Sequence, residues 1–272
     1  MRSYQLTAIS DQLRAISYWL FAIGGWTIAA AAPLAAQRFG RGVNGEEALS
    51  APPNPPYDGR FIYARIRFTQ SCCVQGGQYW DVKWGHDYPR SDFHFPKILQ
   101  ELTSMRVRTD ASVIVTLDDP ELFKYPFAYL CEPGYWLPSE SEVTGMRNYL
   151  LKGGFLIIDD FVGNHWYNFE EQMRRVFPLL RPIPMTADHP IFDSFYRIPS
   201  LEFAHPNYPG ITAKFYGFFE DNDPKKRLLA IVNYDYDVSE YWEFSDEGFF
   251  PIDLTNEAYK LGVNYIIYAL SR

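Results

Sequence analysis

The 272-residue sequence predicts an α/β domain built on a mostly parallel sheet with helices on both faces. Three observations support this fold class. Short apolar runs, typical of strands buried on both faces, alternate with helical segments along the chain. Two of the helical segments are marked by recognisable capping residues. The apolar fraction of 47% is large enough to fill a core, which excludes a disordered chain.

The first 36 residues have the three parts of a secretory signal. Arg2 and Arg14 precede an apolar run over residues 18–32, and small residues follow at 33–36. Export with cleavage at the end of this segment is the favoured interpretation, and it places the protein in the periplasm or outside the cell. An uncleaved membrane anchor is the alternative, because residues 18–36 approach the roughly 20 needed to span a bilayer. A buried core helix is the third interpretation.

A proline-rich linker separates this segment from the folded part. The run from residue 51 to 56 holds four prolines, which suit neither a helix nor the interior of a sheet. We therefore expect a linker over residues 37–59 and one folded domain over residues 60–272. The chain is acidic, with 25 Lys and Arg against 33 Asp and Glu. This balance argues against a nucleic-acid-binding protein, which needs clustered basic side chains.

The first half of the domain is expected to contribute three strands and one helix. The first strand is predicted over residues 61–68, where apolar and basic residues alternate near the end. A helix over residues 95–105 follows a long loop, with Pro96 in its first turn. Two further apolar strands are expected at 111–117 and 127–131.

Capping residues define the next two helices. The first has a capping box at Ser139 and Glu142, and two glycines end it after Leu151. A central strand is expected over residues 155–158, and the capping pattern recurs at Asn168 for a second helix. The remaining expected elements are strands over 213–219 and 228–233 and a C-terminal helix over 256–270 with one buried apolar stripe.

The three cysteines do not define a disulfide framework. Cys72, Cys73 and Cys131 are an odd number, and a chain of this length can fold without bridges. Buried thiols are the favoured interpretation. In an oxidising compartment, a single bridge from Cys131 to Cys72 or Cys73 is the alternative.

Acidic and imidazole side chains follow several of the predicted strands. Ligands of open α/β sheets bind beyond the carboxyl ends of the strands, so we expect these side chains to meet in one cleft. Local turns and helix caps are the competing roles for the same residues. The candidate cleft residues are His86, Asp87, Asp118, Asp159, Asp160 and His165.

Four aromatic rings in the loop after the first strand are candidates for stacking on a ligand. They are Tyr79, Trp80, Trp84 and Tyr88. The loop is polar and contains glycine, which makes burial of the rings harder to arrange. Packing of the rings onto the sheet as a lid is an equally favoured interpretation.

Several motifs resemble the bacterial domain-of-unknown-function family 4159 (DUF4159). They are Trp-Gly-His-Asp-Tyr-Pro-Arg-Ser-Asp at residues 84–92, Asp-Asp-Pro-Glu-Leu at 118–122 and Gly-Gly-Phe-Leu-Ile-Ile-Asp-Asp at 153–160. His-Pro-Ile-Phe at 189–192 is similar as well. The resemblance covers roughly residues 61–272. It implies a flavodoxin-like three-layer sandwich, similar in fold to class I glutamine amidotransferases, and no established activity.

The resemblance also exposes a departure from the amidotransferases, whose nucleophilic Cys lies at a glycine-flanked turn after a central strand. Here the central strand ends in Asp159 and Asp160 without a Cys, and no glycine precedes Cys131. A thiol nucleophile also needs a nearby base. Glutaminase activity is therefore not expected.

Two classes of function fit the sequence. The first is a ligand-binding domain of the cell envelope without glutaminase activity, for a small polar or carbohydrate-like ligand. The second is a hydrolase that uses carboxylates and histidine, with a divalent metal as an optional partner. No cofactor is evident, and association with the membrane or with envelope proteins stays open. The groups of such a hydrolase would be His86, Asp87, Asp118, Asp159 and Asp160.

Overall fold

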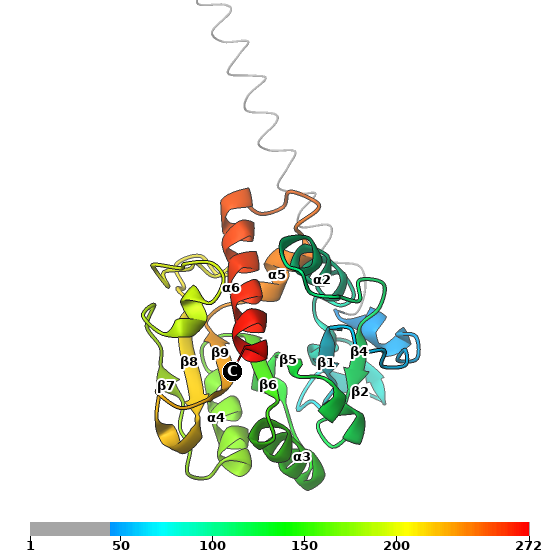
Figure 1. Ribbon diagram of the computed structural model, residues 1–272. Helices are drawn as coiled ribbons and strands as arrows, with labels where there is room; N and C mark the ends of the chain where they lie inside the picture. Colours follow the sequence, from blue (N-terminus) through cyan, green and yellow to red (C-terminus); the bar gives the residue numbers. More distant parts are fainter. Residues whose placement is uncertain (1–43, 272) are drawn as a thin grey trace, which may run out of the picture. The chain divides into compact units, whose positions relative to one another are not determined.

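Seven strands form one mixed sheet in the computed structural model, which describes residues 44–271 (Figure 1). The strand order is β4-β1-β5-β6-β9-β8-β7. The first five strands in this order pair in parallel, and β8 and β7 extend the sheet through antiparallel pairs. Numbered along the chain, the parallel strands have the order 2-1-3-4-5, which is flavodoxin-like. The predicted α/β class and mostly parallel sheet are confirmed.

The strands are longest at the centre of the sheet. They are β1 (Ala64–Ile66), β4 (Val113–Val115), β5 (Phe127–Cys131), β6 (Phe155–Phe161), β7 (Ile183–Pro184), β8 (Lys214–Phe219) and β9 (Leu228–Tyr234). A small hairpin of β2 (Val74–Gln75) and β3 (Gln78–Tyr79) lies in the loop after β1. The strand expected over 155–158 continues to residue 161, because β6 keeps its partners in β5 and β9.

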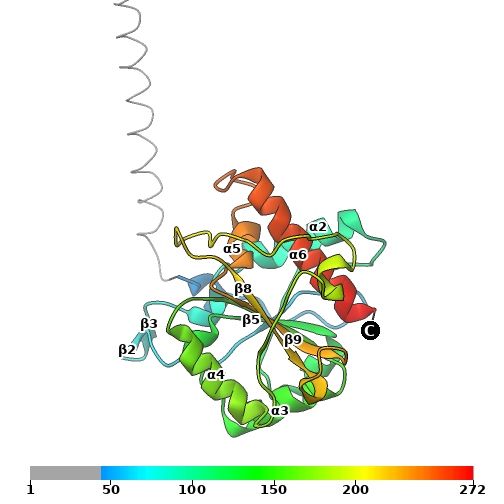
Figure 2. The ribbon, with the colours of Figure 1, turned by 90° about the vertical axis from the view of Figure 1, so that its left-hand side faces the viewer.

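Helices cover both faces of the sheet (Figure 2). One face carries α2 (Arg90–Leu102), α5 (Val238–Glu243) and α6 (Ile252–Leu270), and the other carries α3 (Glu140–Leu151) and α4 (His165–Val176). Each layer encloses its own apolar core, with Phe95 and Trp242 in the first and Met146 and Phe169 in the second. Short 3-10 helices lie at η1 (Glu46–Ser50), η2 (Lys83–Gly85), η3 (Pro120–Lys124), η4 (Pro133–Tyr135), η5 (Pro190–Asp193) and η6 (Glu220–Asn222).

The predicted start of α2 is wrong. The helix begins at Arg90 instead of residue 95, so Pro96 lies in its interior. The additional turn contains Ser91 and Asp92, both fully buried, and Arg65 donates hydrogen bonds to both side chains. A long-range contact therefore sets the start of this helix, and the local sequence gives no sign of it.

The predicted cap of α4 is also wrong. The helix begins at His165, so Asn168 lies within its first turn. The Asn168 amide donates to the carbonyls of Pro133 and Trp136, at 3.0 and 2.9 Å. Asn168 therefore joins α4 to the segment after β5 instead of capping the helix.

Helix α3 begins as predicted, with both hydrogen bonds of the capping box between Ser139 and Glu142. Its close approach to the loop after β4 depends on Gly145. A Cβ atom at this position would lie 2.0 Å from the carbonyl oxygen of Leu117, which is main chain and cannot move aside cheaply.

We therefore expect Gly145→Ala to destabilise the protein by about 2–3 kcal/mol, although alanine normally favours a helix over glycine by about 1 kcal/mol. The melting temperature should fall by roughly 5–10 °C. Thr144→Ala, at the exposed neighbouring position, is the matched control and should change stability by less than about 0.5 kcal/mol. A Gly145→Ala protein as stable as the control would contradict this packing.

The described part of the expected linker lies against the sheet. Asn54 donates from Nδ2 to the carbonyl of Ile114 at 2.8 Å and accepts from the Ile114 N–H at 2.9 Å. The segment therefore covers the outer edge of β4, which would otherwise expose unpaired main-chain groups. The expected signal or anchor, residues 1–36, lies outside the described residues. Within residues 44–271, no helix has the length and apolar character that a bilayer crossing requires.

Candidate functional site

Acidic side chains gather at the carboxyl ends of the parallel strands. Glu132 follows β5, and Asp160 lies near the end of β6. The long loop between β1 and α2 brings His86 and Asp87 to the same edge. In residues 44–271, three overlapping groups of such side chains have potential ligand atoms within 4.8 Å of one another. The structure therefore brings His86, Asp87 and Asp160, all predicted from the sequence, into one region.

Arg65 of β1 fixes the loop that carries these residues. Its guanidinium is fully buried and donates to the carboxylate of Asp92, with a shortest N–O distance of 2.5 Å. It also donates to the main-chain carbonyls of Trp84, at 3.2 Å, and His86, at 2.8 Å. One buried arginine thus ties the loop and the first turn of α2 to the sheet, using the several donors of its planar head group.

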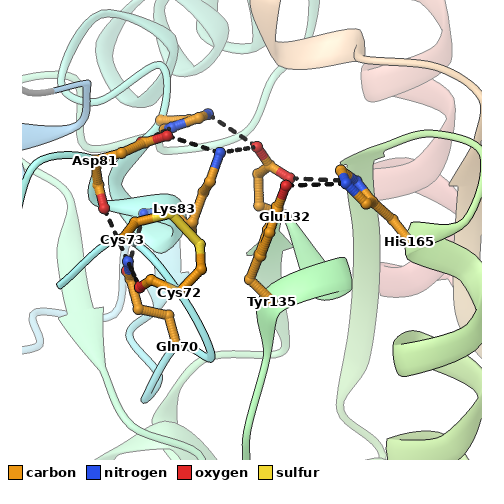
Figure 3. The surroundings of a disulfide bond; sticks show 9 residues. Gln70, Cys72, Cys73, Asp81, Lys83, Glu132, Tyr135 and His165 are labelled. Atoms are coloured by element: carbon orange, nitrogen blue, oxygen red, sulfur yellow. Dashed lines mark hydrogen bonds and ion pairs between the residues drawn. A yellow bond between two sulfur atoms is a disulfide. The ribbon is translucent and has the colours of Figure 1, made fainter.

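The His86 cluster consists of His86, Glu132 and Asp160 together with Asp81 and Lys83. The imidazole Nε2 lies 2.6 Å from Asp81 Oδ1, and Nδ1 lies 3.3 Å from Glu132 Oε1 and 3.5 Å from Asp160 Oδ2. Lys83 Nζ lies between Asp81, at 2.8 Å, and Glu132, at 3.0 Å (Figure 3). Both imidazole nitrogens face carboxylate oxygens, so both carry hydrogen and the ring is positively charged.

The pKa values agree with this charge pattern. Burial opposes the charge on His86, but hydrogen bonds to Asp160 and Asp81 outweigh it and raise the pKa of the imidazole to about 10. Burial also opposes the charge on Asp160, yet the hydrogen bond and the charge of His86 lower its pKa below the usual value. Burial and the charge of Asp160 raise the pKa of Glu132 to about 8. The cluster is therefore an ion-pair network in which the positive and negative charges largely neutralise one another.

The Glu240 cluster consists of Asp87, Asp237 and Glu240, and one carboxylate oxygen of each lies within 4.8 Å of the others. The three residues are only 9%, 3% and 7% exposed. Asp237 caps α5 by accepting from the Glu240 N–H at 2.9 Å, and Ser239 Oγ donates to Asp87 at 2.5 Å. Burial and then the charge of Asp160 raise the pKa of Asp87, while burial and then Asp87 raise that of Glu240 to about 9.

Asp159 is fully buried between β6 and the start of α5, where it has a structural role. Its carboxylate accepts from Tyr129 at 2.8 Å and from Asn233 at 2.9 Å. It also accepts from the main-chain N–H groups of Val238 and Ser239, at 2.9 and 3.3 Å. Burial raises its pKa to about 7 in spite of these bonds. Asp159 thus orients α5 instead of presenting a free carboxylate.

Three acidic residues of the two clusters have a left-handed backbone. The φ angle is 61° at Asp87, 47° at Glu132 and 60° at Asp160. Non-glycine residues are uncommon in this region, although Asp tolerates it better than most. Such conformations often gather at functional sites, where the surrounding structure holds each side chain in place.

Cys131 is a buried thiol at the end of β5. Its Sγ donates to Asp160 Oδ2 at 3.2 Å, and burial followed by the Asp160 charge raises the pKa of the thiol well above its ordinary value. A thiol held in this way is a poor nucleophile. The considered bridge from Cys131 to Cys72 or Cys73 is wrong, because Cys72 and Cys73 are joined to each other. Buried free thiols were the favoured interpretation for all three, and this holds for Cys131 alone.

The disulfide lies in the loop that leads to the His86 cluster (Figure 3). Beside it, the Gln70 amide donates to the carbonyls of Cys72, at 2.9 Å, and Asp81, at 2.8 Å. Gln70 Oε1 accepts from the Lys83 N–H at 3.0 Å. One amide side chain therefore joins both arms of the loop and positions Asp81 and Lys83 for their ion pairs.

Asp118 does not join either cluster. It is exposed and accepts hydrogen bonds from Thr116 Oγ1, at 2.7 Å, and Ser141 Oγ, at 2.9 Å, which lower its pKa. Its neighbour Asp119 caps η3 by accepting from the Glu121 N–H, as the sequence predicts. Asp118 therefore serves the junction between β4 and α3.

His165 lies at the margin of the His86 cluster. Its Nε2 is 2.9 Å from the Tyr135 hydroxyl, and its Nδ1 is 3.9 Å from Glu132 Oε2 (Figure 3). Burial, followed by the charge of Lys83, lowers the pKa of its imidazole. His165 is thus a neutral neighbour of the charged network near pH 7.

The four predicted stacking rings have different surroundings. Trp84 is 3% exposed and belongs to the core, so little of its ring is open to a ligand. Tyr79 and Tyr88 are half-buried and pack against the same core, whereas Trp80 is 59% exposed. The packing interpretation therefore describes Trp84 better than the stacking one.

A cavity of about 330 Å³ lies beyond the carboxyl ends of β1 and β4. The rings of Tyr79 and Trp84 form part of its wall. Its charged lining residues are Arg67 and Glu142, and Glu142 is occupied by the capping box of α3. Arg67 is exposed and forms no ion pair with any residue between 44 and 271.

Sequence reasoning missed several acidic residues of the site. Asp237, Glu240 and Glu243 follow one another at intervals of three, which places their side chains on one face of α5. Burial followed by the charge of Asp87 raises the pKa of Glu243 to about 8. Glu132, directly after the apolar β5, was missed as well. An Asp-x-x-Glu-x-x-Glu pattern after a buried strand could have identified the first three.

The comparison with protein families covers both clusters. Residues 73–270 match the model of a domain of unknown function, DUF4159. The chain belongs to this family. No curated protein matches the chain. The DUF4159 match includes the whole His86 cluster and the whole Glu240 cluster, whereas Arg65 and Arg67 precede it.

Proposed function

We propose that the chain is an exported ligand-binding domain of the cell envelope, on an amidotransferase-like scaffold without glutaminase activity, for a small carbohydrate-like ligand. The cavity beyond β1 and β4 is the observation that carries this proposal. Its volume of about 330 Å³ is at the lower end of the roughly 300–1,000 Å³ typical of small-molecule sites. It therefore suits one sugar unit better than a chain of several.

The lining of the cavity suits a polar, negatively charged sugar. Thr69 offers a hydroxyl group, Thr116 Oγ1 can still accept while it donates to Asp118, and Tyr79 offers an aromatic ring. The Arg67 guanidinium, which has no ion pair within residues 44–271, suits a carboxylate on the ligand. A sugar acid such as glucuronate meets these requirements, and glucose is the matched neutral sugar.

The absence of a usable nucleophile supports binding over glutaminase chemistry. Cys131 is buried, and its hydrogen bond to Asp160 favours the protonated thiol. A carboxylate–histidine hydrolase is the second candidate, favoured by the contact of His86 with Glu132 and Asp160. It is the weaker one, because an imidazole with both nitrogens directed at carboxylates has no lone pair to act as a base.

Thermal unfolding of the full chain with each sugar tests the proposal. With a Kd near 1 mM, 10 mM glucuronate should raise the melting temperature by about 3–6 °C, and glucose should raise it less. Arg67→Ala should abolish the difference between the sugars, whereas Arg174→Ala, on the exposed face of α4, should preserve it.

The proposal would be refuted if neither sugar shifted the transition or if Arg67→Ala left the glucuronate effect intact. Release of 4-nitrophenol from 4-nitrophenyl glucuronide, lost in Glu132→Gln, would support the hydrolase instead.

A further inference from the structure

We propose that the Glu240 cluster is a binding site for one divalent cation that prefers oxygen ligands, with Asp87, Asp237 and Glu240 as its ligands. This site is separate from the cavity assigned to the carbohydrate-like ligand, so it does not depend on the proposed function. The two groups of acidic residues at the sheet edge differ in one respect that decides which of them suits an ion.

The two clusters differ in how many positively charged side chains lie next to their carboxylates. In the His86 cluster, the charges of His86 and Lys83 lie within 3.5 Å of their acidic partners. Within residues 44–271, no Lys, Arg or His forms an ion pair with any carboxylate of the Glu240 cluster. Arg65 and His86 act on Asp87 only over a longer distance. Buried carboxylates are normally paired or bound to metal.

A second observation points to the same place. Glu240 is 93% buried by area, since 7% is exposed, and its Oε1 has no hydrogen-bond partner in residues 44–271. The side chain of Asn207 lies near the same carboxyl group and lowers its pKa, against the larger effect of burial. A buried, unpartnered carboxylate oxygen is costly unless the group is protonated or a cation is bound to it, and a cation would replace the proton here.

The spacing of the oxygens fits a single ion. One oxygen from each of Asp87, Asp237 and Glu240 lies within 4.8 Å of the other two. Ligands at about 2.3–2.6 Å from Ca²⁺ lie up to about 4.6–5.2 Å apart, which matches this limit, whereas ligands at about 2.1 Å from Mg²⁺ lie up to about 4.2 Å apart and would require the carboxylates to move closer together. Three carboxylates without a nitrogen or thiolate favour Ca²⁺, Mg²⁺ or Mn²⁺ over Zn²⁺.

The neighbouring residues support the arrangement without completing it. Glu243, one turn further along α5, adds a fourth carboxyl group at the margin, and burial followed by the charge of Asp87 raises its pKa to about 8. The Ser239 hydroxyl donates its single hydrogen to Asp87, and its Oγ lies 3.2 Å from Asp237 Oδ1, so Ser239 holds the Asp87 carboxylate beside that of Asp237. Asp237 accepts the capping hydrogen bond of α5 with one carboxylate oxygen, so its second oxygen remains for an ion.

The test is thermal unfolding and calorimetric titration of the full, chelator-treated chain with CaCl₂, MgCl₂, MnCl₂ or ZnCl₂ at 1 mM. For a Kd near 10 μM, we expect at least one of the first three ions to raise the melting temperature by about 5–10 °C. Glu240→Gln, which keeps the size of the side chain, should weaken the affinity at least about tenfold.

Glu132→Gln is the matched control, because it alters the His86 cluster and should leave the ion affinity unchanged. No shift with any ion would overturn the proposal. It would also be overturned if Glu132→Gln abolished the shift and Glu240→Gln did not, since the ion would then lie in the His86 cluster. A response to Zn²⁺ alone, lost in Cys131→Ala, would place the ion between Asp87, Cys131 and Asp160 and would equally contradict it. A failure to bind sugar would leave each of these results unaffected.

Discussion

Raising the pH from 6.5 to 8.5 should destabilise the metal-free protein by at least about 2–3 kcal/mol and lower its melting temperature by at least roughly 5 °C. Burial and a nearby charge raise the pKa of Glu132 to about 8, and burial raises that of Asp159 to about 7. In the unfolded chain both groups have their usual pKa values of about 4, so both are ionised at pH 6.5. The folded state therefore holds more protons over this interval, and stability falls as the pH rises.

The lower limit of pH 6.5 avoids an opposing effect. His165 and His205 have pKa values lowered by burial, so their contribution to stability is lost as the pH falls below about 6.5. Between pH 6.5 and 8.5, each of these two imidazoles changes stability by less than about 0.5 kcal/mol, because the folded ring is largely neutral and the unfolded ring loses its remaining half charge. Unfolding curves measured with a chelator in this interval report the buried carboxyl groups together with His86, whose raised pKa lowers stability in the same direction as the pH rises.

A substitution of Glu132 tests how much of the pH dependence of stability this residue causes. Glu132→Gln removes one of the titrating groups, whose pKa is about 8, and should reduce the loss of stability over this interval by about 2 kcal/mol. Asp118→Asn, at an exposed carboxylate outside both clusters, should leave the dependence unchanged. Stability that rises between pH 6.5 and 8.5 in the metal-free protein would contradict the assigned pKa directions.

Arg65→Met should destabilise the protein by about 3–5 kcal/mol, which is the cost of leaving one partner of a buried ion pair uncompensated. Asp92 is fully buried, and its partner Arg65 is fully buried as well. The substitution also removes the donors to the carbonyls of Trp84 and His86, so the loop that carries Asp87 loses its attachment to β1. Denaturant unfolding measures the loss.

Two further variants separate the ion pair from general core damage. Arg65→Lys keeps the charge but not the planar set of donors, and it should fall between the wild type and Arg65→Met. Arg65→Met combined with Asp92→Leu removes both charges and should recover part of the stability lost in the single variant. An Arg65→Met protein within about 1 kcal/mol of the wild type would show that this arginine does not hold the loop.

The elements that could be predicted from the sequence are those fixed by local chemistry. The β5 strand and the α3 capping box at Ser139 and Glu142 are observed as expected, because apolar run length and cap geometry involve neighbouring residues only. The start of α2 and the role of Asn168 depend on Arg65 and on the carbonyl of Pro133, which are far away in the sequence. No local pattern contains that information.

The residues of the candidate site likewise include some that the sequence predicts and some that it does not. His86, Asp87 and Asp160 could be predicted because acidic residues after strands of a parallel sheet share one edge. Asp237 and Glu240 are harder to predict, because α5 has only six residues and too few turns for an apolar periodicity, so only the spacing of the acidic residues after β9 marks them. The bridge between Cys72 and Cys73 joins adjacent residues, so it leaves no spacing in the sequence that would distinguish it from a pair of free thiols.

A Mn²⁺ soak of crystals of the full chain tests the central claim most directly, because anomalous scattering locates the ion without reference to activity. The account predicts one strong anomalous peak within bonding distance of carboxylate oxygens of Asp87, Asp237 and Glu240, and no such peak in crystals of Glu240→Gln. Peaks confined to exposed carboxylates, or a peak among His86, Glu132 and Asp160, would contradict it.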